Sequence, residues 1–439
     1  MARRAADLTQ FATAYLERNP HIFQTVAAFA IRIVGALLSF GFTILLARHY
    51  GPAGVGQFGL AVTTLLIAST AALMGTDYIL IRTVAGDIKI GRRDLARGAI
   101  RTVATMVVIT SGVIALVLTL GVAPALERLY QSASDGLVLR AVTFGVIPVA
   151  LIRIVSSALR SSGRVLLAQV LDGPASMALA IATVLLLHFA GMGGTVVSAG
   201  IVYVAAIGVC VAAGAVVQWR DMRHWPHTHV PLPPLLAQGW PILCVVLVGY
   251  SIDWLILTLL AAHHSAAEVG IFRTAWQVTS IFNLIIISFD AVAGPRIAAA
   301  HRVGDLSGIA RTWRQAVAII LTLSMPLFVL TLAFPGLVMQ LFGSAFAEGV
   351  TVLRILALAQ FVNVLTGPIG SILIMTGGER YSLANSMLSL AVALAAALTL
   401  IPLYGLTGAA IASALTLSVR NLIGWMIVAF KLKLPLLRR

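Results

Sequence analysis

The sequence predicts an all-α integral membrane protein with about twelve transmembrane helices, arranged as two parallel six-helix repeats (6+6) around a central cavity. Three observations carry this prediction: the composition, the lengths of the apolar runs and an internal repeat. Hydrophobic residues make up 60% of the 439 residues and charged residues 10%, whereas soluble domains are roughly 45–50% apolar and about 25% charged. The net charge of +15 resides in short gaps between apolar runs. It therefore does not indicate a nucleic-acid surface, and we predict no nucleic-acid partner.

Each predicted helix is an apolar run of about 20 residues or more, the length that a helix needs to cross a bilayer. Glycine, proline or charged residues bound every run. The first run is too long for a signal peptide and has no small-residue cleavage site, so we expect it to be retained, with residues 1–21 lying before it as a short helix at the cytoplasmic surface. In chain order, the predicted spans are 22–47, 57–80, 99–121, 138–159, 166–187, 196–218, 239–260, 269–293, 312–334, 351–375, 382–400 and 406–430.

The distribution of basic residues predicts the orientation of these helices. Of the 30 basic residues, 22 fall in gaps on one side of the membrane. The four on the other side are Arg48, Arg128, Arg140 and Arg354. Under the positive-inside rule, this asymmetry places both termini in the cytoplasm.

An internal repeat divides the chain into two halves. Residues 47–61 align without gaps on residues 261–275, an offset of 214, and seven of the fifteen positions are identical. A repeat unit with an even number of helices gives parallel halves, with a central site expected between them near the midplane. We predict an N-terminal half at 1–218, a polar cytoplasmic linker at 219–238 and a C-terminal half at 239–439.

Several motifs are better explained by a structural role than by binding of a nucleotide or a metal. The stretch from Gly54 to Gly59 matches the dinucleotide-binding fingerprint, but it follows a spanning helix instead of a cytosolic strand, so we interpret its glycines as allowing close helix packing. Two groups of loop histidines have no carboxylate or cysteine at ligand spacing, and both cysteines fall inside apolar runs. We therefore predict no metal site and no cofactor. The histidines are His224, His227, His229, His263 and His264; the cysteines are Cys210 and Cys244.

Charged residues inside the spans are the candidate functional residues. A charge at the centre of a spanning helix costs roughly 2.5–3.5 kcal/mol on insertion scales, so such residues must pair, reach the interface or line a wet cavity. Arg32 and Arg420 each lie about 15 Å from the nearest helix end. Arg273 replaces Gly59 of the first half, an asymmetry suited to one asymmetric ligand. We predict that Arg32, Arg420, Arg153 and Arg273 bind substrate.

The acidic residues within the spans are predicted to be charge partners or carriers of a coupling ion. Asp253 lies deep in the seventh span and is the natural partner for Arg32 or Arg420. Asp77, Asp172 and Asp290 lie within two turns of cytoplasmic ends, where their side chains can also reach the interface.

These segments together resemble a known family. Ala47-Arg-His-Tyr-Gly-Pro52 followed by Gly56-Gln-Phe58 is similar to the signature after the first helix of oligosaccharide flippases, the O-antigen flippase type of polysaccharide biosynthesis protein. These belong to the multidrug/oligosaccharidyl-lipid/polysaccharide exporter superfamily. The resemblance covers essentially the whole chain, with Tyr50 where the family usually has leucine. Its other matches are Gly75-Thr-Asp77 with Arg82, Asp253 with Val269-Gly-Ile-Phe272, Pro295-Arg296, and Leu341-Phe-Gly343 with Phe346.

The resemblance implies a flippase, not an enzyme, in the bacterial cytoplasmic (inner) membrane. Such a protein moves a polyprenyl-diphosphate-linked oligosaccharide to the periplasmic leaflet by alternating access, for O-antigen, capsule or exopolysaccharide synthesis. It also implies membrane lipid, a polysaccharide polymerase and chain-length machinery as partners. The residues fit that substrate independently, because arginine offers a planar donor fork to a diphosphate and stays charged when desolvated.

Other functions stay open at this point. A cation-coupled drug antiporter would share the fold, although the first helix has Arg32 and no acidic residue. A peptidoglycan lipid-precursor flippase differs only in a head group that no motif encodes. A membrane glycosyltransferase would need carboxylates near a large loop, and the sequence has no such acidic cluster. A scaffold without transport would have to maintain costly buried charges.

Overall fold

The structure is a computed structural model that describes residues 20–129, 133–191, 194–226 and 228–431. All regular secondary structure in these ranges is helical, as predicted. The expected surface helix before residue 20, His227 and the basic residues at 433, 438 and 439 lie outside the described residues.

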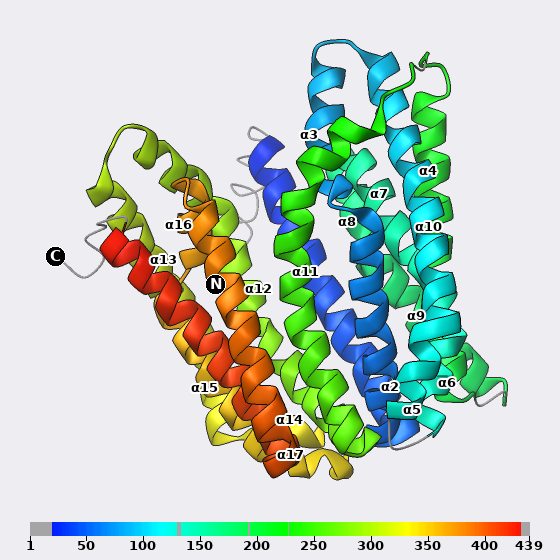
Figure 1. The fold of residues 1–439 in the computed structure, drawn as a ribbon, viewed down its shortest axis with the longest axis vertical. Helices are drawn as coiled ribbons and strands as arrows, with labels where there is room; N and C mark the ends of the chain where they lie inside the picture. Colours follow the sequence, from blue (N-terminus) through cyan, green and yellow to red (C-terminus); the bar gives the residue numbers. More distant parts are fainter. Residues whose placement is uncertain (1–19, 130–132, 192–193, 227, 432–439) are drawn as a thin grey trace, which may run out of the picture.

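Two lobes make up the molecule, and Figure 1 shows them side by side. The N-terminal lobe contains α2 (Pro20–Leu73), α3 (Thr76–Lys89), α4 (Arg93–Val117), α5 (Ala123–Leu129), α6 (Ala133–Val142), α7 (Val146–Ser161), α8 (Val165–Leu171), α9 (Pro174–Phe189) and α10 (Val196–Met222). The C-terminal lobe contains α11 (Leu232–His263), α12 (Ala266–Arg302), α13 (Leu306–Ala333), α14 (Pro335–Gln340), α15 (Val350–Thr366), α16 (Ile369–Met375) and α17 (Glu379–Met426).

Ten helical segments of the described chain are long and apolar enough to cross a membrane, and two of these, with 47 and 52 residues, are long enough for two crossings. The α2 helix has 54 residues, about 81 Å at 1.5 Å per residue, whereas a hydrocarbon core is about 30 Å thick. It breaks at Gly51, whose φ of 67° suits glycine alone. The 48-residue α17 breaks in the same way at Gly405. The two extra crossings bring the total to the twelve expected.

The helices extend beyond the apolar runs at the junction of the two halves. The α10 helix continues to Met222 and α11 begins at Leu232, so the connection outside the helices is residues 223–231, which lies within the predicted linker at 219–238. The residues added to α10 include the charged Arg220 and Asp221, whereas those added to α11 at 232–238 are mostly leucine and proline. A run of apolar residues measures hydrocarbon thickness and not helix length.

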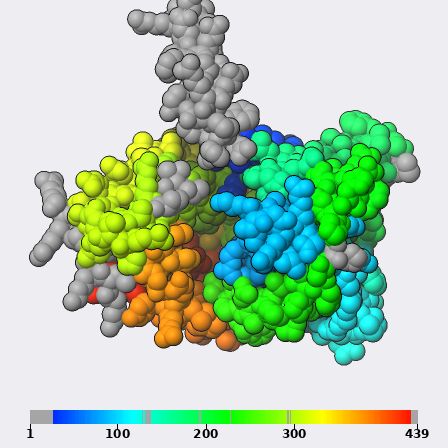
Figure 2. Space-filling view, turned by 90° about the horizontal axis from the view of Figure 1, so that it is seen from above, coloured from blue at the N-terminus to red at the C-terminus, as the bar shows by residue number. Residues whose placement is uncertain are grey.

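The lobes are splayed apart at the end that carries most of the basic residues, and they meet at the other end (Figure 1). Figure 2 looks onto the splayed end and shows a hollow between the lobes. The positive-inside rule assigns the splayed end to the cytoplasm. The molecule is therefore open toward the cytoplasm and closed toward the opposite face.

The closed end is held by the repeated segments themselves. A Cβ atom on Gly56 would lie 2.0 Å from the carbonyl oxygen of Ala266, and one on Gly270 would lie 1.8 Å from that of Pro52. Gly56 and Gly270 are equivalent in the repeat, so the two halves touch backbone to backbone near their pseudo-twofold axis. This contact confirms that Gly56 allows close helix packing. Arg48 adds a second link between the lobes by donating from Nη2 to the Leu341 carbonyl oxygen at 3.0 Å.

Candidate functional site

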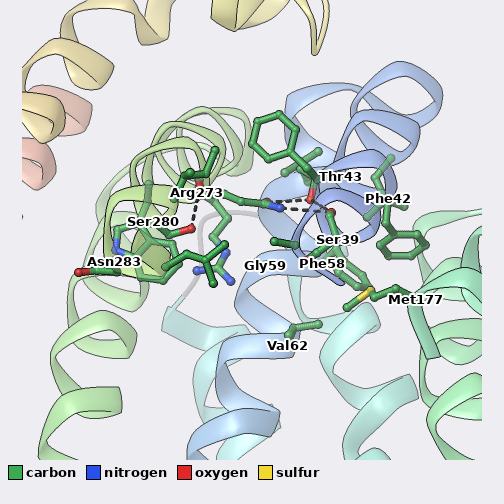
Figure 3. Close-up of a pocket in the computed structure, with 18 of the residues that line it drawn as sticks. Ser39, Phe42, Thr43, Phe58, Gly59, Val62, Met177, Arg273, Ser280 and Asn283 are labelled. Atoms are coloured by element: carbon green, nitrogen blue, oxygen red, sulfur yellow. Dashed lines mark hydrogen bonds between the residues drawn. The ribbon is translucent and has the colours of Figure 1, made fainter. Parts of the chain in front are cut away.

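A cavity of about 370 Å³ lies between the lobes, against the closed end. Its walls come from both arms of α2, from α9 and α10, and from α12 on the opposite lobe. Figure 3 shows α2 and α12 facing each other across it. We call it the interlobe cavity, and its polar lining residues are Ser39, Thr43, Tyr203, Arg273, Gln277, Ser280 and Asn283.

Hydrogen bonds cross this cavity from one lobe to the other. Thr43 Oγ1 donates to Gln277 Oε1 at 2.7 Å, and Gln277 Nε2 donates to the Ser39 carbonyl oxygen at 3.2 Å (Figure 3). Ser280 Oγ donates to the Gln277 carbonyl oxygen at 2.7 Å. One glutamine on α12 thus bonds to α2 through both ends of its amide, and these bonds must break if the lobes separate here.

Arg273 is the cation of the interlobe cavity. Its Cζ lies 4.7 Å from the centroid of the Trp276 ring, a cation–π contact that holds the guanidinium within the cavity wall. The ion pairs of the described residues do not include Arg273. A guanidinium with no carboxylate bound to it keeps its planar donor fork for an anionic ligand.

The repeat explains why only one half carries this arginine. Gly59 and Arg273 are equivalent positions, and they face each other across the pseudo-twofold axis. A Cβ atom on Gly59 would lie 3.0 Å from Cγ of Arg273. Two long side chains therefore cannot both occupy this place. The asymmetry seen in the sequence corresponds to a single cation beside the axis.

Arg32 lies on the cytoplasmic side of the cavity. It precedes Ala36, Ser39 and Thr43 at spacings of 4, 7 and 11 residues, so it shares with them the face of α2 that lines the cavity. Its side chain is exposed. This places Arg32 one helical turn beyond the cavity lining, toward the open end.

Arg420 and Asp253 line a second cavity of about 170 Å³ inside the C-terminal lobe, which we call the C-lobe cavity. Asp253 and Arg420 share this lining, but no ion pair joins them in the described part of the chain, and Arg32 is not part of the lining. Trp276 and Asn283 line both cavities and form the wall between them. Asn363 bonds to that wall, because its Nδ2 donates to Asn283 Oδ1 at 2.9 Å.

Arg153 lies apart from both cavities, within the N-terminal lobe. Its Nη2 donates to Asp77 Oδ2 at 2.8 Å and its Nη1 to Thr70 Oγ1 at 3.2 Å. Asp77 is buried, so this ion pair neutralises a charge inside the lobe. The structure places Arg153 in a pair between helices and not in the lining of the interlobe cavity.

The remaining two acidic candidates also lie away from the interlobe cavity. Asp172 pairs with Arg160 at 2.9 Å. Asp290 lies next to Ser371, and its Oδ1 is buried without a hydrogen-bond partner among the described residues.

Sequence reasoning missed the uncharged polar residues of the interlobe cavity. Ser39 and Thr43 are four residues apart, and Arg273, Gln277 and Ser280 are spaced by four and three, so each set lies on one helix face. A polar stripe along an otherwise apolar span is a signal that could have identified them. The missed residues are uncharged, so a criterion of charge within the spans does not select them.

The lobes, the cavity between them and its opening toward one face define a multi-pass membrane protein built of two helical lobes. Two solved structures share this fold at low sequence identity. One is described as the inward-facing conformation of a multidrug resistance MATE family transporter of the MOP superfamily; it has a TM-score of 0.74 and 16% identity, over 93% of this chain and 98% of that one. The other is a MOP superfamily transporter from Pyrococcus furiosus, with a TM-score of 0.65 and 16% identity, over 93% and 94%.

The sequence comparison is more specific. The profile of the family described as "Polysaccharide biosynthesis protein" matches residues 24–301, and the chain belongs to this family. A second profile, MatE, matches residues 241–401. A curated relative, the probable low-salt glycan biosynthesis flippase Agl15 of Haloferax volcanii, is 26% identical over 176 residues. That alignment spans 40% of this chain and 37% of the relative's length.

Proposed function

We propose that the protein is a flippase, with no catalytic chemistry, that moves a polyprenyl-diphosphate-linked oligosaccharide from the cytoplasmic to the periplasmic leaflet of a bacterial inner membrane. The observation that carries this proposal is the single guanidinium of Arg273, which forms no ion pair within the described ranges of the chain and lies beside the pseudo-twofold axis in the interlobe cavity. Membership of the polysaccharide biosynthesis family and the similarity to a glycan biosynthesis flippase support the same assignment.

The chemistry of the cavity matches each part of this substrate. The diphosphate binds Arg273, and Arg32 attracts it at the cytoplasmic mouth. Sugar hydroxyls exchange hydrogen bonds with Ser39, Thr43 and Gln277, while Trp276 offers an aromatic face. A cavity of about 370 Å³ is smaller than an oligosaccharide, so the sugar extends into the hollow between the splayed lobes. The polyprenyl chain stays in the bilayer.

Transport requires the closed end to open. The Gly56–Gly270 contact, the Arg48 hydrogen bond and the Gln277 bonds all join the lobes at that end. Breaking them while the cytoplasmic end closes exposes Arg273 to the opposite face. With the cell interior negative, moving each net negative charge outward is favoured by about 2.3 kcal/mol per 100 mV.

Asp253 is the residue placed to carry a coupling ion. Asp77 and Asp172 already hold arginines in ion pairs, and Asp290 lies next to Ser371 and lines neither the interlobe cavity nor the C-lobe cavity. Asp253 instead lines the C-lobe cavity with Arg420, and it lies within Coulombic range of both Arg420 and Arg273. An anionic substrate bound at Arg273 would therefore change the electrostatic potential at the Asp253 carboxylate.

The test is deletion of the gene followed by analysis of lipid-linked sugars. The proposal expects a completed repeat unit to accumulate on the cytoplasmic leaflet and surface polysaccharide to be lost. Complementation by the unchanged chain should restore export, and complementation by Arg32→Glu should not, although the variant inserts in the membrane. A normal lipid-linked pool in the deletion strain would contradict the proposal.

A drug antiporter is the second candidate, favoured by the MatE match over residues 241–401 and by the multidrug transporter that shares the fold. Its cation would bind at the carboxylate of Asp253 and not at Arg273. The same deletion strain separates the two functions, because antiport predicts altered drug sensitivity with a normal lipid-linked pool.

A further inference from the structure

The connection between the two halves is fastened along the N-terminal part of α4. Thr228 donates from its backbone N–H to the Asp94 carbonyl oxygen at 3.3 Å and from Oγ1 to Asp94 Oδ2 at 2.9 Å. Thr102 Oγ1 donates to the Val230 carbonyl oxygen at 3.1 Å. At Gly98 a Cβ atom would lie 1.9 Å from the Thr228 carbonyl oxygen, so the connection lies directly on the helix backbone.

A groove of about 670 Å³ remains beside this fastening, between α4, the connection and the start of α11. We call it the lateral groove. It shares no lining residue with the interlobe cavity. Its lining residues are Gly98, Arg101, Thr102, Thr105, Met106, Ile109, Thr110, Thr228, His229 and Leu232.

The lateral groove changes character along its length. Arg101 and His229 are both exposed, one on α4 and one on the connection, and neither side chain takes part in an ion pair or hydrogen bond recorded among the described residues. Met106, Ile109 and Leu232 make the other part apolar. Ile109 lies eight residues, about 12 Å, further along α4 than Arg101.

The position of the lateral groove relative to the membrane identifies its surroundings. Beyond Arg101, α4 presents exposed apolar side chains that include Val108, Ile109 and Val113, a face suited to lipid. Arg101 and the connection lie at the cytoplasmic end of this face. A molecule in the lateral groove therefore has a polar end at the cytoplasmic interface and an apolar part along a lipid-facing helix.

We propose that the lateral groove binds an anionic glycerophospholipid of the cytoplasmic leaflet, with its phosphate between Arg101 and His229 and an acyl chain along Thr105 and Ile109. Charge complementarity selects an anionic head group, and the apolar floor requires a chain. One lipid then bridges α4 and the connection, and adds to the hydrogen bonds that fasten the connection to the N-terminal lobe.

Native mass spectrometry of the purified full chain tests this site, with phosphatidylglycerol and phosphatidylethanolamine of identical acyl chains added in equal amounts. We expect preferential retention of phosphatidylglycerol. An arginine near an anionic head group contributes about a fivefold gain in binding, so Arg101→Gln with His229→Gln should lower phosphatidylglycerol retention at least about fivefold and leave phosphatidylethanolamine almost unchanged. Arg101→Lys should preserve the preference.

The matched control is Arg302→Gln, which removes an exposed cytoplasmic arginine from the other lobe and should leave the preference intact. Thr105→Trp fills the lateral groove while keeping both basic residues, and it should lower retention of both lipids. Unchanged phosphatidylglycerol retention in the double variant would overturn the proposal, as would an equal loss in the Arg302→Gln control. Undiminished retention in Thr105→Trp would show that the lipid binds outside the lateral groove.

Discussion

Replacing Gly270 with alanine should shift the protein away from the conformation described here. The added Cβ would lie 1.8 Å from the Pro52 carbonyl oxygen, whereas an ordinary van der Waals contact begins at 3.4 Å. The obstructing atom belongs to the backbone of the other lobe, so no side-chain rotation relieves the overlap. The lobes must separate by about 1.6 Å at the closed end, or the helices must distort.

The size of the shift follows from the cost of overpacking. Extra methyl groups in a packed interior cost about 1–3 kcal/mol, and here the cost applies only to the conformation in which the lobes touch at Gly56 and Gly270. At about 1.4 kcal/mol per tenfold change, the population of the closed-end conformation falls roughly 5- to 150-fold relative to the alternative.

Distances between spin labels at the closed end measure this population. Phe189 and Leu337 are exposed there on opposite lobes, at 83% and 61% of full exposure, and are suitable label positions once Cys210 and Cys244 are replaced by serine. Gly270→Ala should move the distance distribution to longer values. Gly208→Ala is the matched control, because a Cβ there meets nothing within 4 Å. A distribution unchanged from the parent protein in Gly270→Ala would refute the reasoning.

Three further predictions concern charged positions. Gly59→Arg should abolish surface polysaccharide export by crowding Arg273, whereas the exchange of both residues, Gly59→Arg with Arg273→Gly, should recover export measurably above either single variant because it moves one cation across the pseudo-twofold axis. Asp77→Asn leaves Arg153 without its buried partner and should cost about 3–5 kcal/mol, seen as a lower Tm, and Arg153→Gln should behave alike. Asp305 accepts hydrogen bonds from Ser307 and from the first turn of α13, which holds its pKa below the ordinary value of 3.8. Ionised Asp305 therefore stabilises the start of α13 above pH 3.8, and this stabilisation is lost as the pH falls through the lower pKa of the folded state. In that low pH range, hydrogen exchange of the first-turn amides of α13 should accelerate. The Asp305→Ala variant should show the same acceleration at neutral pH.

Most of the fold follows from the sequence because hydrocarbon imposes a minimum length on each apolar run. The repeat at an offset of 214 also predicts the symmetric arrangement, and the glycines at 56 and 270 are identical in both copies because both backbones approach the same axis. The sequence does not show that two long helices break at Gly51 and Gly405. Each lies in a short connection between two runs, where composition does not reveal whether the helix continues.

The candidate site was predicted only in part. The Gly59 and Arg273 difference pointed to a position that lines the interlobe cavity, because it compares equivalent places in the two halves. The pairing of Arg153 with Asp77 joins residues 76 positions apart and depends on which helices are neighbours. Gln277 was missed because the sequence does not show which helix faces an uncharged amide within a span, and its partners Ser39 and Thr43 lie on α2.

The central claim is that Arg273 binds the diphosphate of a lipid-linked oligosaccharide during translocation. Proteoliposomes loaded with a labelled polyprenyl-diphosphate oligosaccharide test it most directly, with a membrane-impermeant reagent reporting how fast the sugar changes leaflet. We predict rapid exchange with the unchanged chain and a roughly 10- to 150-fold slower rate for Arg273→Gln. This factor corresponds to the loss of hydrogen bonds to a charged group, which are worth about 1.5–3 kcal/mol. An equal rate in Arg273→Gln, or no exchange with the unchanged chain, would contradict it.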